Sequence, residues 1–225
     1  MATYRKKEKV MLEISNISRK YRRGPKEFIA LADVTIKIDK GDFVSVTGPS
    51  GSGKSTLLNV IGGLICPDSG EVLFNGNSIY KQNNRLTVEY RKKNVGFMFQ
   101  QFHLMPYLTV LENIKLACYT RQLHENINKY MVNCSLEGLT DKYPSELSVG
   151  EKQRTAFIRA IISDPEVLLA DEPTGNLDPA NSNILMSLVE EYHKNGGTVV
   201  LVSHDPAAAR YSNQNINLDK GRIVL

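Results

Sequence analysis

Apolar and polar positions follow two different periods along these 225 residues. Residues 10–17 and 29–38 are rich in β-branched side chains that partly alternate with polar ones, which predicts strands of a sheet with one solvent-facing side. The runs 167–169 and 199–202 are apolar at every position, which favours parallel strands covered on both faces. Half-exposed and fully buried strands are therefore expected in the same chain.

Segments with helical spacing of apolar residues alternate with these strands. Four such segments are found, at 54–61, 109–139, 151–162 and 181–193. Shorter apolar segments predict further strands, at 43–47, 71–74, 95–99, 214–218 and 222–225. This alternation, with its buried strands, is typical of an α/β fold with a mostly parallel core sheet.

Length and composition are those of an ordinary globular domain. Hydrophobic residues make up 41% and charged residues 23% of the chain. We expect a single domain over residues 1–225, with a helical subdomain at about 105–160. No apolar run approaches the roughly 18 to 20 residues needed to cross a bilayer, and residues 1–9 are polar and basic. A cytoplasmic protein with a mobile N-terminal end is expected.

The net charge of +4 is mild and comes largely from short basic clusters. No aromatic residues interleave these clusters in an RNA-binding pattern, so they favour solvated surface over a nucleic-acid patch, and no nucleic-acid partner is expected. A face toward an anionic membrane is a further, weaker alternative. Cys66, Cys118 and Cys134 are odd in number and widely spaced, which indicates reduced packing residues rather than disulfides or a metal site.

Residues 48–55 fit the phosphate-loop pattern G-x-x-x-x-G-K-[ST] between a predicted strand and a predicted helix. The glycines let backbone N–H groups converge on phosphate oxygens, and the helix N-terminus adds its dipole. Lys54 is expected to neutralise the β- and γ-phosphates, and Ser55 to place its hydroxyl on Mg²⁺. A simple Gly/Ser turn is the alternative. The candidate nucleotide-binding residues here are Gly48, Pro49, Ser50, Gly51, Ser52, Gly53, Lys54 and Ser55.

Two adjacent carboxylates, Asp171 and Glu172, follow the apolar run at 167–169. Open α/β sheets place ligands at the carboxyl ends of their strands. Asp171 is the expected Mg²⁺ partner, usually through water, and Glu172 is placed to polarise an attacking water. Acidic pairs after strands are often only helix caps, but the phosphate loop upstream favours the catalytic interpretation.

Between these two motifs lies Leu147-Ser148-Val149-Gly150-Glu151, which resembles the signature sequence of ABC transporter ATPases. The resemblance covers nearly the whole chain and implies a P-loop cassette with a mostly parallel core sheet, an antiparallel β subdomain and a small helical subdomain. In that family one subunit covers the γ-phosphate of ATP held by another. Ser148 and Gly150 match the residues that make this contact, and the ATP-binding set is extended to Thr56 beside the loop.

The resemblance assigns four further residues. Tyr21 looks like the aromatic residue that stacks on adenine, with a packed surface tyrosine as the alternative. Gln100 looks like the glutamine that senses Mg²⁺ and couples to the membrane partner, with its neighbour Gln101 as the alternative register. Asp178 is similar to the aspartate that communicates across the dimer. His204 resembles the histidine that contacts the γ-phosphate.

The remaining histidines, at 103, 124 and 193, have no such motif around them and are expected to be structural or surface residues.

The signature departs from the family's usual Leu-Ser-Gly-Gly-Gln at two positions. Val149 replaces a glycine, so this position must tolerate a Cβ and is not expected to have a positive φ. Glu151 replaces a glutamine, which removes a donor and places a negative charge where a phosphate is expected. The glutamate is a mild change whose charge also suits a helix N-terminus, whereas Val149 is the departure expected to affect the efficiency of dimer closure or hydrolysis.

Segments 55–64, 106–114 and 171–178 resemble the lipoprotein-releasing and macrolide-exporting group, whose permeases work by mechanotransmission. The resemblance implies an ATP-hydrolysing subunit that binds Mg²⁺, dimerises with a second copy around two ATP and lies on the inner face of the membrane through a permease. The alternative is a cell-division-type or regulatory ABC ATPase that recruits a membrane partner and hydrolyses weakly.

Two other classes of P-loop protein fit the sequence less well. Soluble ABC proteins of DNA repair or translation are expected to carry tandem cassettes or long coiled-coil insertions, and this sequence has neither. A P-loop kinase is expected to lack Ser148, Gly150 and His204 and to need an acceptor site. The transported substrate and the permease are not readable from the sequence.

Overall fold

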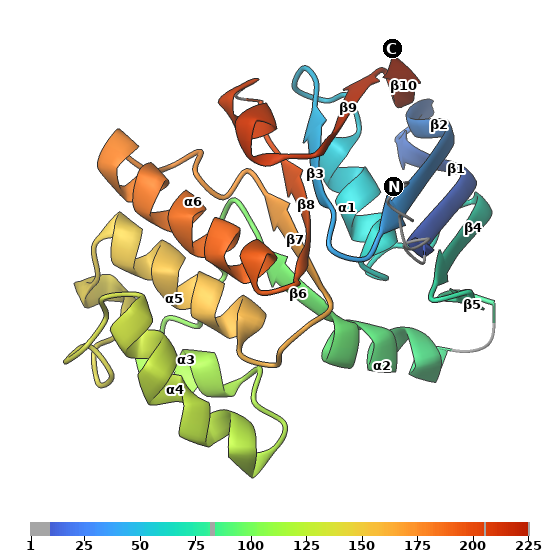
Figure 1. Cartoon of the computed structure of the whole chain (residues 1–225). Helices are drawn as coiled ribbons and strands as arrows, with labels where there is room; N and C mark the ends of the chain where they lie inside the picture. The colour runs from blue at the N-terminus through green and yellow to red at the C-terminus, as the bar shows by residue number, and fades with distance from the viewer. Residues whose placement is uncertain (1–9, 82–83, 205, 225) are drawn as a thin grey trace, which may run out of the picture.

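The computed structural model describes residues 10–81, 84–204 and 206–224, and the expected mobile end at 1–9 lies outside them. Two sheets form the body of the protein (Figure 1). One sheet is antiparallel, with strand order β2-β1-β4-β5. Its strands are β1 (Val10–Arg23), β2 (Lys26–Asp39), β4 (Ser69–Phe74) and β5 (Asn77–Ser78).

The other sheet has the order β10-β9-β3-β8-β7-β6 and is parallel except where β10 pairs with β9. Its strands are β3 (Phe43–Thr47), β6 (Val95–Met98), β7 (Val167–Asp171), β8 (Thr198–Val202), β9 (Gln214–Asp219) and β10 (Arg222–Val224). The expected mostly parallel core sheet and antiparallel β region are thus confirmed.

The helices cover both faces of the parallel sheet. Helix α1 lies between the two sheets, whereas α5 and α6 cover the opposite face, with α3 and α4 beyond α5 (Figure 1). The helices are α1 (Lys54–Ile61), α2 (Asn84–Asn94), α3 (Val110–Lys115), α4 (Arg121–Asn133), α5 (Val149–Ile161) and α6 (Pro179–Lys194), with 3-10 turns at Pro144–Glu146 and Pro206–Tyr211.

The fully apolar strands serve two hydrophobic cores at once. In β7, Val167 and Leu169 face the core around α1, while Leu168 and Ala170 face the core under α5 and α6. Successive side chains of a strand point to opposite faces, so a strand between two cores needs apolar residues at every position. The apolar runs in the sequence are explained by this double coverage.

Several boundaries differ from those predicted. Strands β1 and β2 continue well beyond 10–17 and 29–38 as a long hairpin, because cross-strand pairs such as Tyr21 with Phe28 maintain the ladder where apolar alternation has ended. The predicted helical segment 109–139 is broken into α3 and α4. Helix α2 was not predicted, because its apolar pattern is weak and only Thr87 and Tyr90 among its described side chains are buried.

The three cysteines are free thiols, as expected, but they do not share one environment. Cys134 is buried in the core under α5, whereas Cys66 is exposed, so the expectation of a packing role was wrong for Cys66. Among the helices of the described residues, none combines the length and the apolar character required to cross a membrane.

Candidate active site

The phosphate loop joins the end of β3 to the start of α1. A Cβ on Gly53 would lie 2.2 Å from the carbonyl oxygen of Ala30, and the φ of Gly53 is 106°, so glycine is required on both counts. The backbone N–H of Gly221, in the turn between β9 and β10, donates to the carbonyl of Ser52 at 2.9 Å. The loop is therefore held in shape by both sheets.

Lys54 is 6% exposed and turns back under the loop. Its Nζ donates to the carbonyl oxygens of Gly48 and Pro49, both at 2.9 Å. An ammonium has three donors, so one remains for a phosphate. The hydroxyl of Ser52 is buried and has no partner among the described residues, which fits a loop built to receive acceptor oxygens.

Asp171, the last residue of β7, lies against the start of α1. Burial raises the pKa of this carboxyl above its usual value, a hydrogen bond from the Ser55 hydroxyl lowers it, the charge of Glu172 raises it and the charge of Lys54 lowers it. These contacts bring Asp171 and Ser55 together beside Lys54. A carboxylate and a hydroxyl beside bound phosphates form the usual protein contribution to an Mg²⁺ site, so these residues fit that ion.

Glu172 leaves the strand with a φ of 45°, in the left-handed region that non-glycine residues seldom adopt. Its backbone N–H donates to the carbonyl of Val202 at the end of β8, at 2.9 Å. Its Oε2 lies 3.3 Å from Nδ1 of His204. The two side chains line one cavity of about 380 Å³, so the structure brings the predicted base and the predicted phosphate sensor together.

Gln100 lies at the same end of the sheet, just after β6. A Cβ on Gly175 would lie 3.7 Å from both Nε2 of Gln100 and Oε2 of Glu172, so the two side chains flank the same glycine. The side-chain amide of Asn176 donates to the carbonyl of Gln100 at 3.1 Å. These contacts favour Gln100 over Gln101 as the residue that faces the site.

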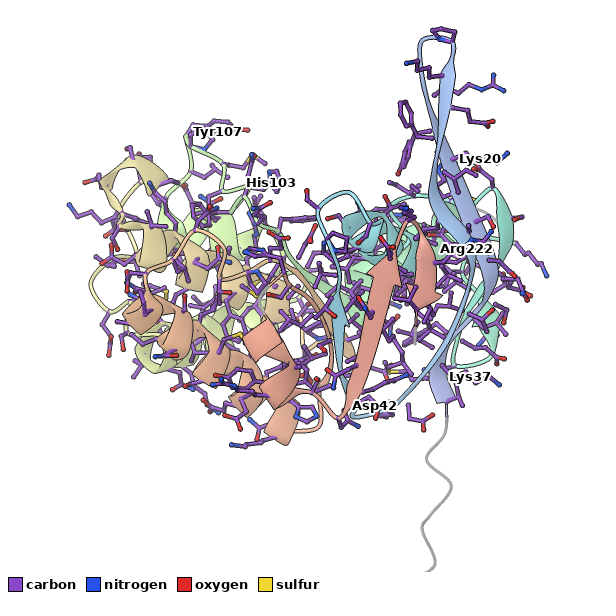
Figure 2. The ribbon with its side chains drawn as sticks, turned by 90° about the horizontal axis from the view of Figure 1, so that it is seen from above. Lys20, Lys37, Asp42, His103, Tyr107 and Arg222 are labelled. Carbon is purple, nitrogen blue, oxygen red and sulfur yellow. The ribbon has the colours of Figure 1, made fainter. Side chains whose placement is uncertain are left out.

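Tyr21 is carried by the long hairpin of β1 and β2. Tyr21 is 37% exposed, and the guanidinium of Arg19 lies 5.2 Å from the ring centroid. Figure 2 shows this hairpin standing out from the body beyond Lys20, while His103 and Tyr107 lie on the helical side. Ala30 of the same hairpin contacts Gly53 of the phosphate loop, and Tyr21 pairs with Phe28, two positions before Ala30. Tyr21 therefore lies on the part of the hairpin that continues from the phosphate loop into solvent.

The signature segment forms the first turn of α5. Ser148 caps the helix: its Oγ accepts from the N–H of Glu151 at 3.3 Å, and the Glu151 carboxylate accepts from the Ser148 N–H at 2.7 Å. Val149 begins the helix, is not among the residues with positive φ, and is 44% exposed. A residue with a Cβ therefore fits at position 149, because the backbone there does not have a positive φ.

Asn181 joins the signature to Asp178, and sequence reasoning missed it. Asp178 caps α6 by accepting from the N–H of Asn181 at 3.0 Å and from its Nδ2 at 2.6 Å. Asn181 Oδ1 accepts from Arg154 at 3.0 Å and would lie 2.2 Å from a Cβ on Gly150. Gly150 is thus fixed as glycine by a neighbouring helix, and the Asp-x-x-Asn spacing at the start of α6 was the available signal.

Gln153 was also missed. It is 1% exposed, and its Nε2 donates to the carbonyl of Pro173 at 2.6 Å, which ties α5 to the segment just after Glu172. The other histidines have structural contacts: His103 packs edge-on against Phe99, and His193 bonds the carbonyl of Gly41 at 2.8 Å. The side chain of His124 lies outside the described residues.

The structure therefore assembles one group around the phosphate loop and a second group on α5 and α6. The first contains Lys54, Ser55 and Asp171, with Glu172, His204 and Gln100 gathered around Gly175 at the ends of neighbouring strands. None of the contacts described for Ser148 and Gly150 reaches the phosphate loop of the same chain.

Comparisons with known proteins agree with this arrangement. The ABC transporter family model matches residues 31–175. The uncharacterized ABC transporter ATP-binding protein YvrO of Bacillus subtilis is 38% identical over 220 residues, 96% of either chain. The macrolide export ATP-binding/permease protein MacB of Chlorobaculum tepidum is 36% identical over 218 residues, and the match covers 95% of this chain but only 34% of MacB.

Among solved structures, the dimeric post-hydrolysis state of the ATP-binding cassette MJ0796 bound to ADP and Pi superposes with a TM-score of 0.88 at 35% identity. The match covers 96% of this chain and 97% of the other. The phosphate loop, the paired carboxylates after β7 and these similarities together show that the chain belongs to the ABC transporter family, as an ATP-binding subunit of the ATP-hydrolysing type.

Proposed function

We propose that this chain is the ATP-hydrolysing subunit of an ABC transporter of the lipoprotein-releasing and macrolide-export type. Two copies bind two ATP head to tail and thereby drive a membrane permease. The observation that carries the proposal is that, among the described residues, no hydrogen bond of the Ser148 side chain and no close neighbour of Gly150 belongs to the phosphate loop that holds Lys54. A dimeric solved neighbour and export-type relatives support it.

In the proposed closed dimer, the phosphate loop of one copy faces the signature of the other. The free donor of Lys54 and the loop amides bind the phosphates, and Tyr21 stacks on the adenine. Ser148 and Gly150 of the second copy supply a hydroxyl and a backbone N–H to the γ-phosphate. Asp178 lies beside this junction at the start of α6.

Ser55, Asp171 and Gln100 are the residues that would hold Mg²⁺. The ion, when bound, neutralises charge on the β- and γ-phosphates. Glu172 orients and polarises the attacking water, and His204, 3.3 Å from the Glu172 carboxylate, is placed to contact the γ-phosphate. Thr56, which follows Ser55 on α1, completes the proposed ATP-binding set.

A groove beside Gln100 is the proposed permease contact. It has a volume of about 320 Å³ and lies between α2, β6 and α5, where Leu116 and Tyr119 are exposed and Lys92 lies 4.9 Å from the Tyr119 ring. A subunit that docks a permease here would sit on the inner face of the membrane. Phe99 lines this groove, and the next residue, Gln100, flanks Gly175 together with Glu172, so the proposed contact is adjacent in the chain to a residue of the hydrolytic site.

The Glu172→Gln variant tests the hydrolytic assignment. It keeps the size of the side chain and removes the charge that polarises water, so hydrolysis is expected to fall by roughly 100-fold or more while ATP binding remains. Light scattering with ATP should show a dimer. The surface variant Glu190→Gln, whose carboxylate pairs with Lys194 on α6, is the control. Hydrolysis near the wild-type rate in Glu172→Gln would refute the role.

A further inference from the structure

The hydrogen-bond inventory of Ser148 leaves little for a phosphate. Its Oγ donates to Oε2 of Glu151 at 2.8 Å and accepts from the Glu151 N–H at 3.3 Å. A serine hydroxyl has one hydrogen, and a phosphoryl oxygen accepts but does not donate. In this structure the only hydrogen that the Ser148 hydroxyl can offer to a phosphate is therefore bound to Glu151.

The negative charge of the Glu151 carboxylate also opposes the binding of a phosphate beside Ser148. The backbone N–H and then the hydroxyl of Ser148 hold the pKa of Glu151 below its usual value, and Arg154 adds a smaller effect in the same direction. Glu151 is thus ionised at neutral pH, within hydrogen-bond reach of the group that is expected to meet the γ-phosphate. Two like charges this close repel each other.

We propose that Glu151 is a positioning residue that holds the Ser148 hydroxyl away from the partner copy's γ-phosphate and so raises the ATP concentration at which two copies close. Closure requires the Ser148–Glu151 hydrogen bond to break and the carboxylate to swing outward. The inference rests on the proposed ATP dimer and deepens it, because it gives this signature a defined effect on the closing equilibrium.

The substitution Glu151→Gln separates the effect of charge from the effect of capping. The oxygen of the new side-chain amide can still accept from the Ser148 N–H, so the helix cap is kept. Both bonds from Ser148 end at the same Glu151 oxygen, so the amide oxygen can also accept from the Ser148 hydroxyl, but the bond to an uncharged acceptor is weaker and the repulsion of a phosphate is absent. If Glu151 is only a cap, this substitution changes nothing at the dimer interface.

The chain offers a matched control in α3. Glu112 forms the same capping box with Thr109, with the Thr109 N–H donating to its carboxylate at 2.9 Å and its own N–H donating to the Thr109 hydroxyl at 3.3 Å. Glu112→Gln therefore removes one charge from an equivalent helix start away from the signature. It is expected to leave dimerisation unchanged.

The experiment measures ATP-dependent dimerisation by light scattering in the hydrolysis-deficient Glu172→Gln background. Addition of Glu151→Gln is expected to lower the ATP concentration at half-dimerisation by about tenfold, equivalent to about 1.4 kcal/mol, whereas addition of Glu112→Gln leaves it in place. Raising NaCl from about 50 to about 500 mM should narrow the gap between the Glu151→Gln protein and its parent, because salt screens the repulsion.

Each outcome has a distinct meaning. Dimers with the same midpoint in the Glu151→Gln protein and its parent overturn the role of Glu151 and leave the proposed function intact. A higher midpoint in the Glu151→Gln protein also overturns it. If neither protein dimerises at saturating ATP while both bind the nucleotide, the proposed ATP dimer is refuted, and the inference falls with it.

Discussion

The phosphate loop and the signature segment both sit at the start of a helix, but their surroundings differ. Lys54 is 6% exposed and is bonded to two carbonyls of its own loop. Val149 is 44% exposed, and the hydrogen bonds of the Ser148 side chain among the described residues stay within the first turn of α5. The phosphate loop is held in shape by hydrogen bonds within the chain, whereas the signature is exposed at the surface of the protein. A difference of this kind is expected when one half-site is preformed and the other awaits a second copy.

The largest expected effect comes from the preformed half. Lys54→Ala removes the charge that balances the phosphates and breaks two hydrogen bonds to the loop, so ATP hydrolysis should fall by roughly 100-fold or more. Fluorescent nucleotide binding should weaken in parallel. Lys37→Ala, at an exposed surface lysine that pairs with Glu13, should leave both measurements unchanged. Tight binding by the Lys54→Ala protein would show that the loop is not the main phosphate site.

The signature half should fail in a different way. Gly150→Ala places a Cβ 2.2 Å from Asn181 Oδ1, so either the hydrogen-bonded side chain of Asn181 or the start of α5 must shift. We expect a loss of ATP-dependent dimers and roughly a 10- to 100-fold loss of hydrolysis, with nucleotide binding by the monomer preserved. Adding Asn181→Ala removes the clash and should restore part of the dimer. Weakened nucleotide binding by the Gly150→Ala monomer would contradict the proposed difference between the phosphate loop and the signature.

A smaller effect is expected on stability, because burial of the Asp171 carboxylate destabilises the fold. Burial raises the pKa of Asp171, so the folded protein binds a proton at this carboxyl more readily than the unfolded chain does. The free energy of unfolding therefore falls as pH rises from the unfolded-state pKa through the folded-state pKa of Asp171. Asp171→Asn should therefore raise the Tm of the nucleotide-free protein by about 2–4 °C at neutral pH while abolishing hydrolysis. Calorimetry without nucleotide makes the comparison, and a lowered Tm would show that Asp171 is net stabilising.

The smallest expected effect concerns Val149. Because Val149 adopts helical backbone and is partly exposed to solvent, Val149→Gly should change the free energy of unfolding by at most about 0.5 kcal/mol and leave the hydrolysis rate within about twofold. Steady-state hydrolysis and chemical denaturation measure both quantities. A large gain in rate would mean that this side chain, rather than Glu151, restrains the dimer, and would support the regulatory alternative.

Local patterns made the phosphate loop and the paired carboxylates predictable. Strand, loop and helix follow one another without interruption around Lys54, and Glu172 comes directly after an apolar strand. The positions of His204 and Gln100 were assigned by resemblance alone, and the structure brings both to Glu172.

Contacts between distant segments were not predictable from the same patterns. The bond of Gln153 to Pro173 and that of Arg154 to Asn181 join residues 20 and 27 positions apart, and nothing periodic marks them. The long hairpin was underestimated for a related reason: near Tyr21 and Phe28 the ladder is held by cross-strand pairing of exposed residues, which leaves no apolar alternation to detect.

Asn181 joins the signature on α5 to the start of α6. It holds Gly150 of the signature and Asp178 in one corner between α5 and α6, and Asp178 is six positions after Glu172 in the sequence. In the proposed dimer this corner faces the γ-phosphate held by the other copy, so its position is expected to depend on whether that phosphate is present. We therefore expect the two ATP sites to act as a coupled pair, with turnover rising more steeply than first order in ATP.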